Sequence, residues 1–273
     1  MLIDTHAHLN FSAYKRNLEE VIKRVVDENV WIINVGSKYE TSKKALEIAL
    51  RYKEGFYAAV GLHPIHAAPG LVKIKTDPDE GDFITSGEDF DMGKYKELAL
   101  SEKVVAIGEI GLDYYYRPKT KKKIEEFKNK QKEVFKKQLD LAKELNLPVI
   151  FHCRMAHQDL TDILKENKGI KGVVHCFTGT LKEVKKYMEM GFYIGLNGII
   201  FKLDLGEIIK QIPLEKILIE TDCPYLTPPQ VKAEQNEPIF VKYVAQRIAE
   251  LKNVDFDKVA EITTQNAKTL FGI

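Results

Sequence analysis

Short runs of apolar residues alternate with amphipathic segments along the whole chain. The runs are rich in β-branched residues and mostly apolar throughout, which is typical of parallel strands that are covered on both faces. They predict eight strands, at residues 2–6, 31–36, 56–61, 104–109, 148–152, 172–175, 192–196 and 217–222.

Apolar positions three and four residues apart predict helices between these strands. The clearest stripe lies within residues 18–26, and another occupies residues 240–251. Residues 127–145 show the spacing less cleanly, in a long segment rich in Lys and Glu that ends before Pro148. Residues 261–270 predict a last helix, so most of the chain between the strands is expected to be helical.

Eight strand–helix units in 273 residues fit the size of a (β/α)8 barrel. A doubly wound open sheet would show the same alternation, so the alternation by itself leaves both architectures open. Nearly all residues with metal-binding or catalytic chemistry follow predicted strands, and the carboxyl ends of the strands are where such barrels carry their active sites. We therefore predict one α/β domain over residues 1–273, a single-domain (β/α)8 TIM barrel.

One segment, residues 66–93, interrupts this rhythm after the third predicted strand. It contains seven acidic residues, two lysines, four glycines and two prolines. A long surface loop costs little to close, so a loop insertion without a function of its own is one interpretation. A lid over the catalytic face is the other, because the segment would extend from that face of a barrel.

The composition is that of a globular protein with little net charge. The 41 Lys and Arg residues balance 40 Asp and Glu residues, giving a formal net charge of +1. This balance argues against nucleic-acid binding through a broad basic surface and leaves local phosphate binding open. Three cysteines exclude a disulfide scaffold and suit a reducing compartment. Without a secretory signal or a membrane-spanning stretch in the sequence, we expect a cytoplasmic protein that does not enter a membrane.

Two histidines lie at the end of the first predicted strand. Because side chains alternate along a strand, His6 and His8 point to the same side of the chain. A pair of imidazoles suits a divalent transition metal, although His-x-His is a weak pattern by itself. Glu109 directly follows the apolar run 104–108, where burying an unpaired carboxylate would be costly. It therefore either turns outward into solvent or binds a cation.

Three further predicted strands also end in a His or a carboxylate, at His152, His175 and Asp222. A single His at such a position is usually a hydrogen-bonded core residue, but in a barrel all these strand ends converge on one mouth. Four His and two carboxylates suffice for two divalent ions with open coordination positions, and they exceed the needs of one tetrahedral ion. The predicted ligands are His6, His8, Glu109, His152, His175 and Asp222.

Each cysteine directly follows one of these predicted ligands. Alternation along a strand turns the neighbour of an inward ligand away from it. Cysteine is also commonly buried as a small hydrophobic residue. We therefore interpret Cys153, Cys176 and Cys223 as packing residues rather than thiolate ligands.

Six motifs appear in a specific order along nearly the whole chain. They are DTHAHL from Asp4, GLHP from Gly61, GEIGLDY from Gly108, HCR from His152, HCFTG from His175 and ETDCPYL from Glu220. In this order they resemble the TatD family of metal-dependent deoxyribonucleases, which belongs to the amidohydrolase-like metal hydrolases. The resemblance extends to the Asn-Glu-Pro stretch at residues 236–238 and the helix predicted after it.

The resemblance implies a (β/α)8 barrel that hydrolyses phosphodiester bonds in DNA, as an exonuclease, with two divalent metal ions. Zinc, manganese, magnesium, iron and cobalt are the candidate ions, with the histidines favouring the others over magnesium alone. The expected partner is DNA, single-stranded or frayed at its ends. The family pattern assigns the six predicted ligands to two ions, one held by His6, His8 and Asp222 and the other by His152 and His175, with Glu109 bridging them.

Two further residues match family positions beside the substrate phosphate, His63 and Arg154. On this interpretation a water activated by the two metals attacks phosphorus, and Asp222 can accept its proton. Arg154 would pair with the phosphate oxygens through its planar guanidinium, and His63 would donate a hydrogen bond. Glu109 and Asp222 are thus the expected catalytic residues.

The chain departs from the family pattern on the substrate side. Met155 follows Arg154, where the family often has an acidic residue, and residues 231–235 lack an Arg-Gly element that commonly precedes Asn-Glu-Pro. A hydrolase of the same fold acting on a small phosphoester, lactone or amide is therefore an alternative. A binding or scaffold protein with a structural metal is another, although structural sites are coordinatively closed.

Two neighbouring segments have more than one interpretation. The consecutive aromatic residues 114–116 either pack the loop after the fourth strand or stack on a terminal base. The Lys-rich residues 119–123 either begin a solvated helix or contact nucleic acid.

Overall fold

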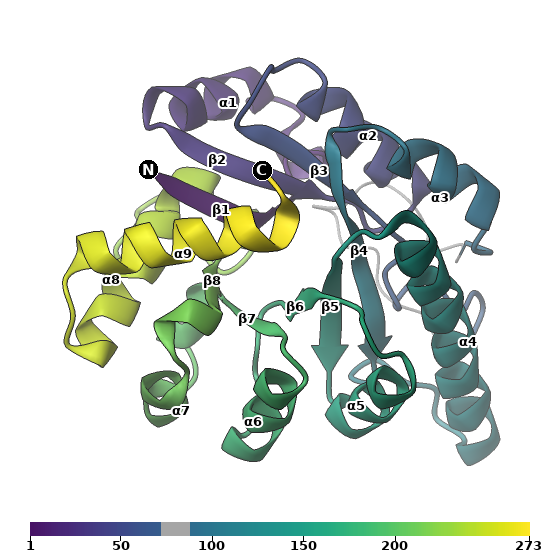
Figure 1. Cartoon of the computed structure of the whole chain (residues 1–273). Helices are drawn as coiled ribbons and strands as arrows, with labels where there is room; N and C mark the ends of the chain where they lie inside the picture. The colour runs from purple at the N-terminus through teal and green to yellow at the C-terminus, as the bar shows by residue number, and fades with distance from the viewer. Residues whose placement is uncertain (72–87) are drawn as a thin grey trace.

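The structure, a computed structural model, describes residues 1–71 and 88–273. Eight parallel strands follow one another around a single sheet in the order of the sequence, and helices surround them (Figure 1). The strands are β1 (Leu2–Ala7), β2 (Val30–Val35), β3 (Phe56–Val60), β4 (Val104–Asp113), β5 (Val149–Arg154), β6 (Gly172–Val174), β7 (Tyr193–Leu196) and β8 (Ile217–Ile219).

The two ends of the sheet meet, which makes it a barrel. An isolated parallel bridge joins Ala7, at the end of β1, to Cys223 in the segment after β8. The Thr5 hydroxyl also donates a hydrogen bond to the carbonyl oxygen of Ile219 at 3.2 Å. The predicted (β/α)8 TIM barrel is therefore confirmed, and the doubly wound alternative is excluded.

The helices of the described residues lie on the outside of the barrel, except α9, which crosses in front of the strands in Figure 1 with both chain termini near it. None of them is long and apolar enough to cross a membrane. They are α1 (Leu18–Asp27), α2 (Tyr39–Ala49), α3 (Met92–Ala99), α4 (Lys121–Leu145), α5 (His157–Glu166), α6 (Leu181–Glu189), α7 (Gly206–Gln211), α8 (Val241–Lys252) and α9 (Phe256–Phe271). Four short 3-10 turns are η1 (Ser12–Tyr14), η2 (Gly198–Phe201), η3 (Leu214–Lys216) and η4 (Pro238–Phe240).

The predicted and observed elements differ mainly at their ends. The strand predicted to end at Glu109 continues to Asp113, because its ladder with β5 runs on to the pair Asp113 and Arg154. The strand predicted to end at Asp222 stops at Ile219. Residues 72–87 of the predicted 66–93 insertion lie outside the described residues, and α3 already begins at Met92.

Two clusters of apolar side chains form the core. The larger one fills the space between the strands and the surrounding helices. The smaller one combines strand residues such as Ile3, Ile33 and Ile150 with Leu270 and Phe271 from the last turns of α9. Because β1 begins next to α9, this helix closes the amino end of the barrel and leaves the carboxyl ends of the strands for a site.

Two glutamines of α4 face the barrel and explain its irregular apolar pattern. Gln138 is fully buried, and its amide bonds both the N–H of Leu62, at 2.7 Å, and the carbonyl of Leu62, at 2.9 Å. Gln131 does the same for the N–H and carbonyl of Asp113, at 2.9 and 3.0 Å. The two side-chain amides thus take the place of the backbone groups that a neighbouring strand would supply. They do so at Leu62, next to His63, and at Asp113, the last residue of β4.

We expect Gln138→Leu to lower the free energy of unfolding by roughly 2–4 kcal/mol, because two buried backbone groups lose their partners. Urea denaturation of the purified protein measures the change. Gln246→Leu on the exposed face of α8 is the matched control, with an expected change below about 0.5 kcal/mol. Equal stabilities of the Gln138 variant and the wild type would contradict this role.

Candidate metal centre

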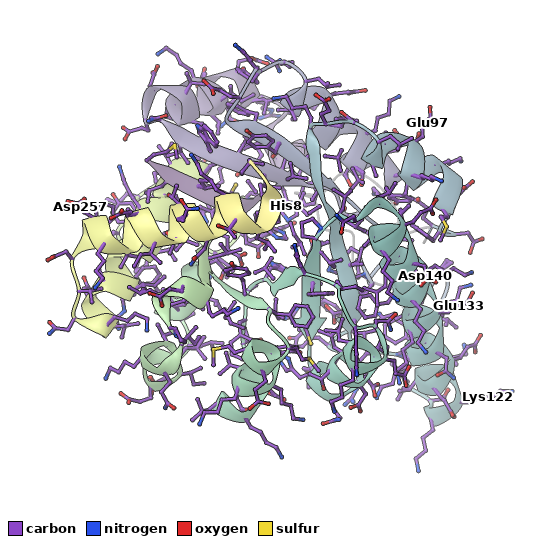
Figure 2. All side chains as sticks on the ribbon, viewed as in Figure 1. His8, Glu97, Lys122, Glu133, Asp140 and Asp257 are labelled. Atoms are coloured by element: carbon purple, nitrogen blue, oxygen red, sulfur yellow. The ribbon has the colours of Figure 1, made fainter. Side chains whose placement is uncertain are left out.

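The carboxyl ends of five strands bring six polar side chains together inside the barrel mouth. His6 lies in the last two residues of β1, His8 follows that strand, and Glu109 and His152 lie within β4 and β5. His175 and Asp222 follow β6 and β8. Figure 2 shows His8 near the middle of the molecule, whereas the labelled charged side chains of α3, α4 and α9 lie around its outside.

The first group consists of His6, His8 and Asp222. The Nε2 atoms of the two imidazoles lie 3.1 Å apart. One oxygen of Asp222, Oδ1, lies 3.4 Å from Nε2 of His8 and 3.8 Å from Nε2 of His6. These atoms are close enough to hold one metal ion.

The second group consists of Glu109, His152 and His175. Nδ1 of His152 lies 3.2 Å from Nε2 of His175. Glu109 Oε2 lies 3.2 Å from that Nδ1 atom and 2.9 Å from Nε2 of His175. These atoms are also close enough to hold an ion.

Glu109 faces both groups with different oxygens. While Oε2 approaches His152 and His175, Oε1 lies 3.8 Å from Nε2 of His6 and 3.7 Å from Nε2 of His8. The carboxylate is 6% exposed, so its negative charge is directed at the imidazoles rather than at solvent. This placement contradicts the possibility that Glu109 turns outward into a solvated loop.

The donor geometry fits divalent transition metals. Two imidazoles on one tetrahedral zinc ion, each about 2.0–2.1 Å from it, have nitrogens about 3.3 Å apart. The nitrogen pairs of the two groups are separated by 3.1 and 3.2 Å. Imidazole and carboxylate donors suit zinc, manganese, iron and cobalt, so the residues present match the ions expected from the sequence.

The surroundings favour the ionised form of both carboxylates of the centre. Burial acts to raise the pKa of Glu109, but His175 and His152 hold it well below its usual range. Burial opposes ionisation of Asp222 too, and the hydrogen bond with His8 together with the neighbouring imidazoles lowers its pKa. Ligands of a cation must carry this charge before the cation binds.

Groups behind the imidazoles set their orientation. His8 Nδ1 lies 2.8 Å from the carbonyl oxygen of Val35, so it carries the proton and leaves Nε2 free as a ligand atom. Asp113 Oδ2 lies 3.1 Å from Nε2 of His152, on the far side of that ring from Glu109. Glu220, fully buried, lies 3.7 Å from Nδ1 of His175.

Sequence analysis assigned no role to Asp113 or Glu220. The alternation of side chains could have found Asp113, because it lies four residues after Glu109 in one strand and faces the same side. Glu220 lies two residues before Asp222. Its Oε1 accepts hydrogen bonds from the N–H of Cys176, at 2.6 Å, and from the Asn197 amide, at 3.2 Å.

A fully buried carboxylate holds the two ends of the barrel together beneath the first group. Asp4 accepts hydrogen bonds from the backbone of His6 and Thr221, at 3.2 and 2.9 Å, and from the Thr221 hydroxyl at 2.5 Å. Burial raises the pKa of Asp4 to about 8. The N–H of Asp222 donates to the carbonyl of His6 at 2.8 Å. The separation of His6 and Asp222 is thus fixed by contacts between β1 and the segment after β8.

Asn236, at the start of the Asn-Glu-Pro stretch, secures the same segment from the other side. Its amide donates to the carbonyls of Thr221, at 3.1 Å, and Tyr225, at 2.6 Å. The next residue, Glu237, forms a two-pronged ion pair with Arg24 of α1, at 2.8 and 2.9 Å. The stretch therefore positions the segment that carries Asp222.

The two predicted substrate residues lie in different surroundings. His63 is buried beside the second group, with Nε2 3.7 Å from Glu109 Oε2. Burial lowers the pKa of His63 to about 3. Because its Nδ1 accepts the N–H of Ile65 at 3.0 Å, the neutral ring carries its proton on Nε2, toward the centre. Arg154 lies at the exposed rim of the mouth, on the same side of β5 as His152.

The cysteines stay outside both groups. Cys153 and Cys223 are buried, and Cys176 is partly buried. Burial raises the pKa of Cys153 and of Cys223 to about 12, which keeps both as neutral thiols. Cys153 packs against Tyr187 and lies 3.2 Å from His157 Nδ1, away from the metal centre.

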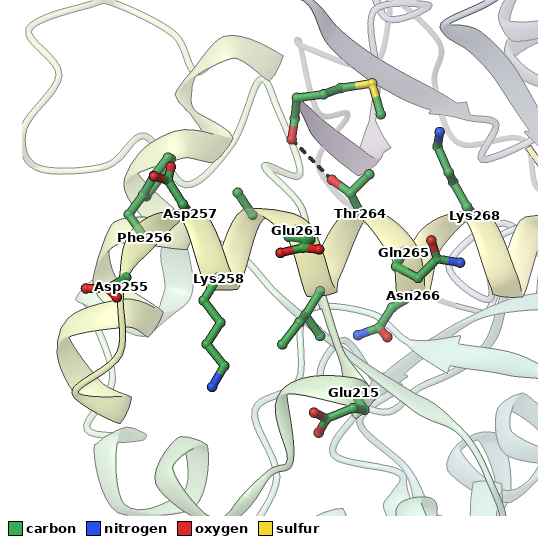
Figure 3. A pocket seen from close by; sticks show the side chains of 13 residues that line it. Glu215, Asp255, Phe256, Asp257, Lys258, Glu261, Thr264, Gln265, Asn266 and Lys268 are labelled. Atoms are coloured by element: carbon green, nitrogen blue, oxygen red, sulfur yellow. Dashed lines mark hydrogen bonds between the residues drawn. The ribbon is translucent and has the colours of Figure 1, made fainter.

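A hollow beside α9 lies at the opposite end of the barrel. Its lining includes Met1, directly before β1, and Glu215, which lies in η3 just before β8. The Thr264 hydroxyl donates to the Met1 carbonyl at 3.2 Å (Figure 3). Asp255, directly before α9, and Asp257 and Lys258, in its first turn, also line the hollow (Figure 3). None of the six predicted ligands lines it, so it is separate from the metal centre.

Comparison with known proteins decides the family. Residues 3–272 match the family described as TatD related DNase. The chain belongs to the TatD family. It is 45% identical, over the full length of both chains, to the uncharacterized metal-dependent hydrolase YabD of Bacillus subtilis. It is 32% identical to the 3'-5' ssDNA/RNA exonuclease TatD of Escherichia coli, covering 100% of this chain and 99% of the relative.

A solved structure of the TatD family has the same architecture. The crystal structure of YJJV, a TatD homolog from Escherichia coli, superposes with a TM-score of 0.81 at 28% identity. The superposition covers 100% of this chain and 98% of that one. This chain is accordingly a TatD-family metal-dependent hydrolase with several clusters of residues able to bind metal ions.

Proposed function

We propose that this protein hydrolyses phosphodiester bonds in DNA as an exonuclease acting on single-stranded or frayed ends, and that it uses two divalent metal ions. The observation that carries the proposal is the placement of Glu109, whose two oxygens face the two separate groups of imidazoles. A carboxylate in this position is suited to bridge two ions. The family membership and the nuclease relatives support a nucleic-acid substrate.

Each residue of the centre has a distinct task in this reaction. His6, His8 and Asp222 would hold one ion, while His152 and His175 would hold the other. Two such ions supply a water of lowered pKa and neutralise charge on the phosphate. The negative charges of Glu109 and Asp222 balance the ions, and Asp222 can accept the proton that the attacking water loses.

His63 and Arg154 would orient the phosphodiester. The Nε2–H of His63 points toward the centre and can donate to a phosphate oxygen. Arg154 has no ion-pair partner among residues 1–71 and 88–273, so the edge of its guanidinium is available for two phosphate oxygens. With binding concentrated on the ions and these two side chains, a net charge of only +1 suffices.

Removal of metal tests this function. We expect thorough chelation to abolish degradation of an end-labelled single-stranded oligonucleotide, and addition of manganese, zinc, cobalt or magnesium to restore it. The products resolved on a gel should form a ladder shortened from one end. Undiminished digestion by the metal-free protein would exclude the mechanism. Failure of the wild type to digest any oligonucleotide with any of these ions would exclude the function.

A small phosphoester, lactone or amide is the second candidate substrate. The observation in its favour is Met155, which is 65% exposed directly beside Arg154, where family members often have an acidic residue. Assays of oligonucleotides and of small esters at equal metal loading separate the two candidates. Higher kcat/KM for a small ester would favour the second.

A further inference from the structure

Two tyrosines and an arginine form an exposed surface beside the metal centre, here called the rim: Tyr115, Tyr116 and Arg154. Tyr115 is 50% exposed and Tyr116 is 42% exposed. The Arg154 guanidinium lies over the Tyr115 ring, with Cζ 3.6 Å from the ring centroid. The two tyrosine rings are 4.9 Å apart at an angle of 88°. Large aromatic groups left exposed in this arrangement require an explanation other than core packing.

The first residue of the aromatic series does not belong to the rim. Tyr114 is buried, its hydroxyl donates to Asp159 at 2.7 Å, and Lys128 lies over its ring. Tyr114 therefore packs the loop after β4 against α4 and α5. Its two neighbours have their rings at the surface instead.

The fold ties the rim to the metal centre. The N–H of Tyr115 donates to Asp113 Oδ1 at 2.8 Å, and the other oxygen of Asp113 lies 3.1 Å from His152. The N–H of Tyr114 donates to the Arg154 carbonyl at 2.9 Å, which joins the ends of β4 and β5. Asp113 thus links the Tyr115 backbone to a predicted metal ligand, and Arg154 lies two residues after that ligand in β5.

We infer that the rim is a subsite for the unpaired base of a nucleotide adjacent to the cleaved phosphodiester, an inference that rests on the proposed function. Tyrosine rings and guanidinium planes are the surfaces on which proteins stack unpaired bases, without selecting among the four bases. The perpendicular rings offer a base one face for stacking and an edge for lateral contact. Stacked on Tyr115, Arg154 is held with its edge free for the phosphate of the same nucleotide.

This arrangement predicts a preference for ends that are single-stranded. A base within a duplex has both faces covered by its neighbours, and stacking on the rim would require its removal from the helix. A frayed or single-stranded terminal base has a free face. The rim would therefore select substrates by their unpaired state rather than by their sequence.

Removal of the base from the substrate tests the rim directly. The substrates are a normal single-stranded oligonucleotide and two versions with an abasic residue at the terminal or the penultimate position of the end that the wild type digests. For the wild type we expect one of the abasic positions to lower kcat/KM for the first cleavage by roughly 10- to 100-fold. The double variant Tyr115→Ala/Tyr116→Ala should lose a similar factor on the normal substrate and show no further loss on the abasic one.

The conservative pair Tyr115→Phe/Tyr116→Phe should retain the sensitivity to base removal, because the rings remain. Metal content and thermal unfolding of all variants show whether the fold and the centre are intact. If the alanine pair keeps the wild-type sensitivity to the abasic residue, the rim is not the base subsite, and the nuclease function stands. If the wild type digests no oligonucleotide at all, both the function and the subsite are overturned.

Discussion

Replacing Glu109 with alanine should lower the kcat for phosphodiester hydrolysis by roughly 10³-fold and reduce the bound metal below two ions per chain. Glu109 is the residue whose oxygens face both groups of imidazoles, at 2.9 to 3.8 Å. Without it, His6, His8, His152 and His175 would surround two cations with less negative charge to balance them. Elemental analysis of the dialysed protein and kinetics at saturating metal measure the two effects separately.

Asp113→Asn is a comparison variant for which we expect a smaller effect. Asp113 contacts the outer nitrogen of His152, on the far side of that ring from Glu109, so we expect its effect to pass through the ring. Loss of such an orienting partner typically costs 10- to 100-fold in metal affinity or activity. Glu133→Gln on the surface of α4 should change neither quantity. A Glu109→Ala protein that bound two ions and kept the wild-type rate would show that Glu109 does not bridge the two ions.

The barrel could be predicted because parallel strands leave a simple signal. Each strand is covered on both faces, so it is a short apolar run, and eight such runs separated by helices fill a chain of this length. The ends of β4 and β5 could not be predicted as well. Glycines on both sides of Glu109 resemble a strand terminus, whereas the ladder to β5 continues as far as Asp113 and Arg154. Pairing between strands outweighs the local preference of the glycines.

The six predicted ligands could be proposed from the sequence for a similar reason. A His or a carboxylate at the end of an apolar strand is conspicuous in the sequence, and the topology then brings distant strand ends together. The roles of Glu220 and Asn236 could not be predicted, because they depend on partners on neighbouring strands and loops. Gln131 and Gln138 even weakened the helical signal of α4, because they place polar groups on its buried face.

Asp222→Asn should lower kcat by about 10²- to 10⁴-fold, the range typical of a lost proton acceptor. Asparagine is the informative replacement because Asp222 has a positive φ of 57°, a conformation that Asn adopts more readily than most residues. The segment after β8 should therefore keep its contacts with Asp4 and Asn236. The amide oxygen can still face His6 and His8, but the side chain can no longer accept the proton of the attacking water. Rates at saturating metal, with metal content measured in parallel, separate the lost proton transfer from weaker binding.

The control for this substitution lies at the other end of the barrel. Asp257→Asn, in the exposed first turn of α9 beside the hollow of Figure 3, removes the same charge without touching the centre. It should leave both metal content and rate unchanged. An Asp222→Asn protein that kept two ions and turned over within threefold of the wild type would show that the proton of the water goes elsewhere. Of the residues in the centre, His63 would not replace it, because its Nδ1 already accepts the Ile65 N–H and its Nε2 carries the proton.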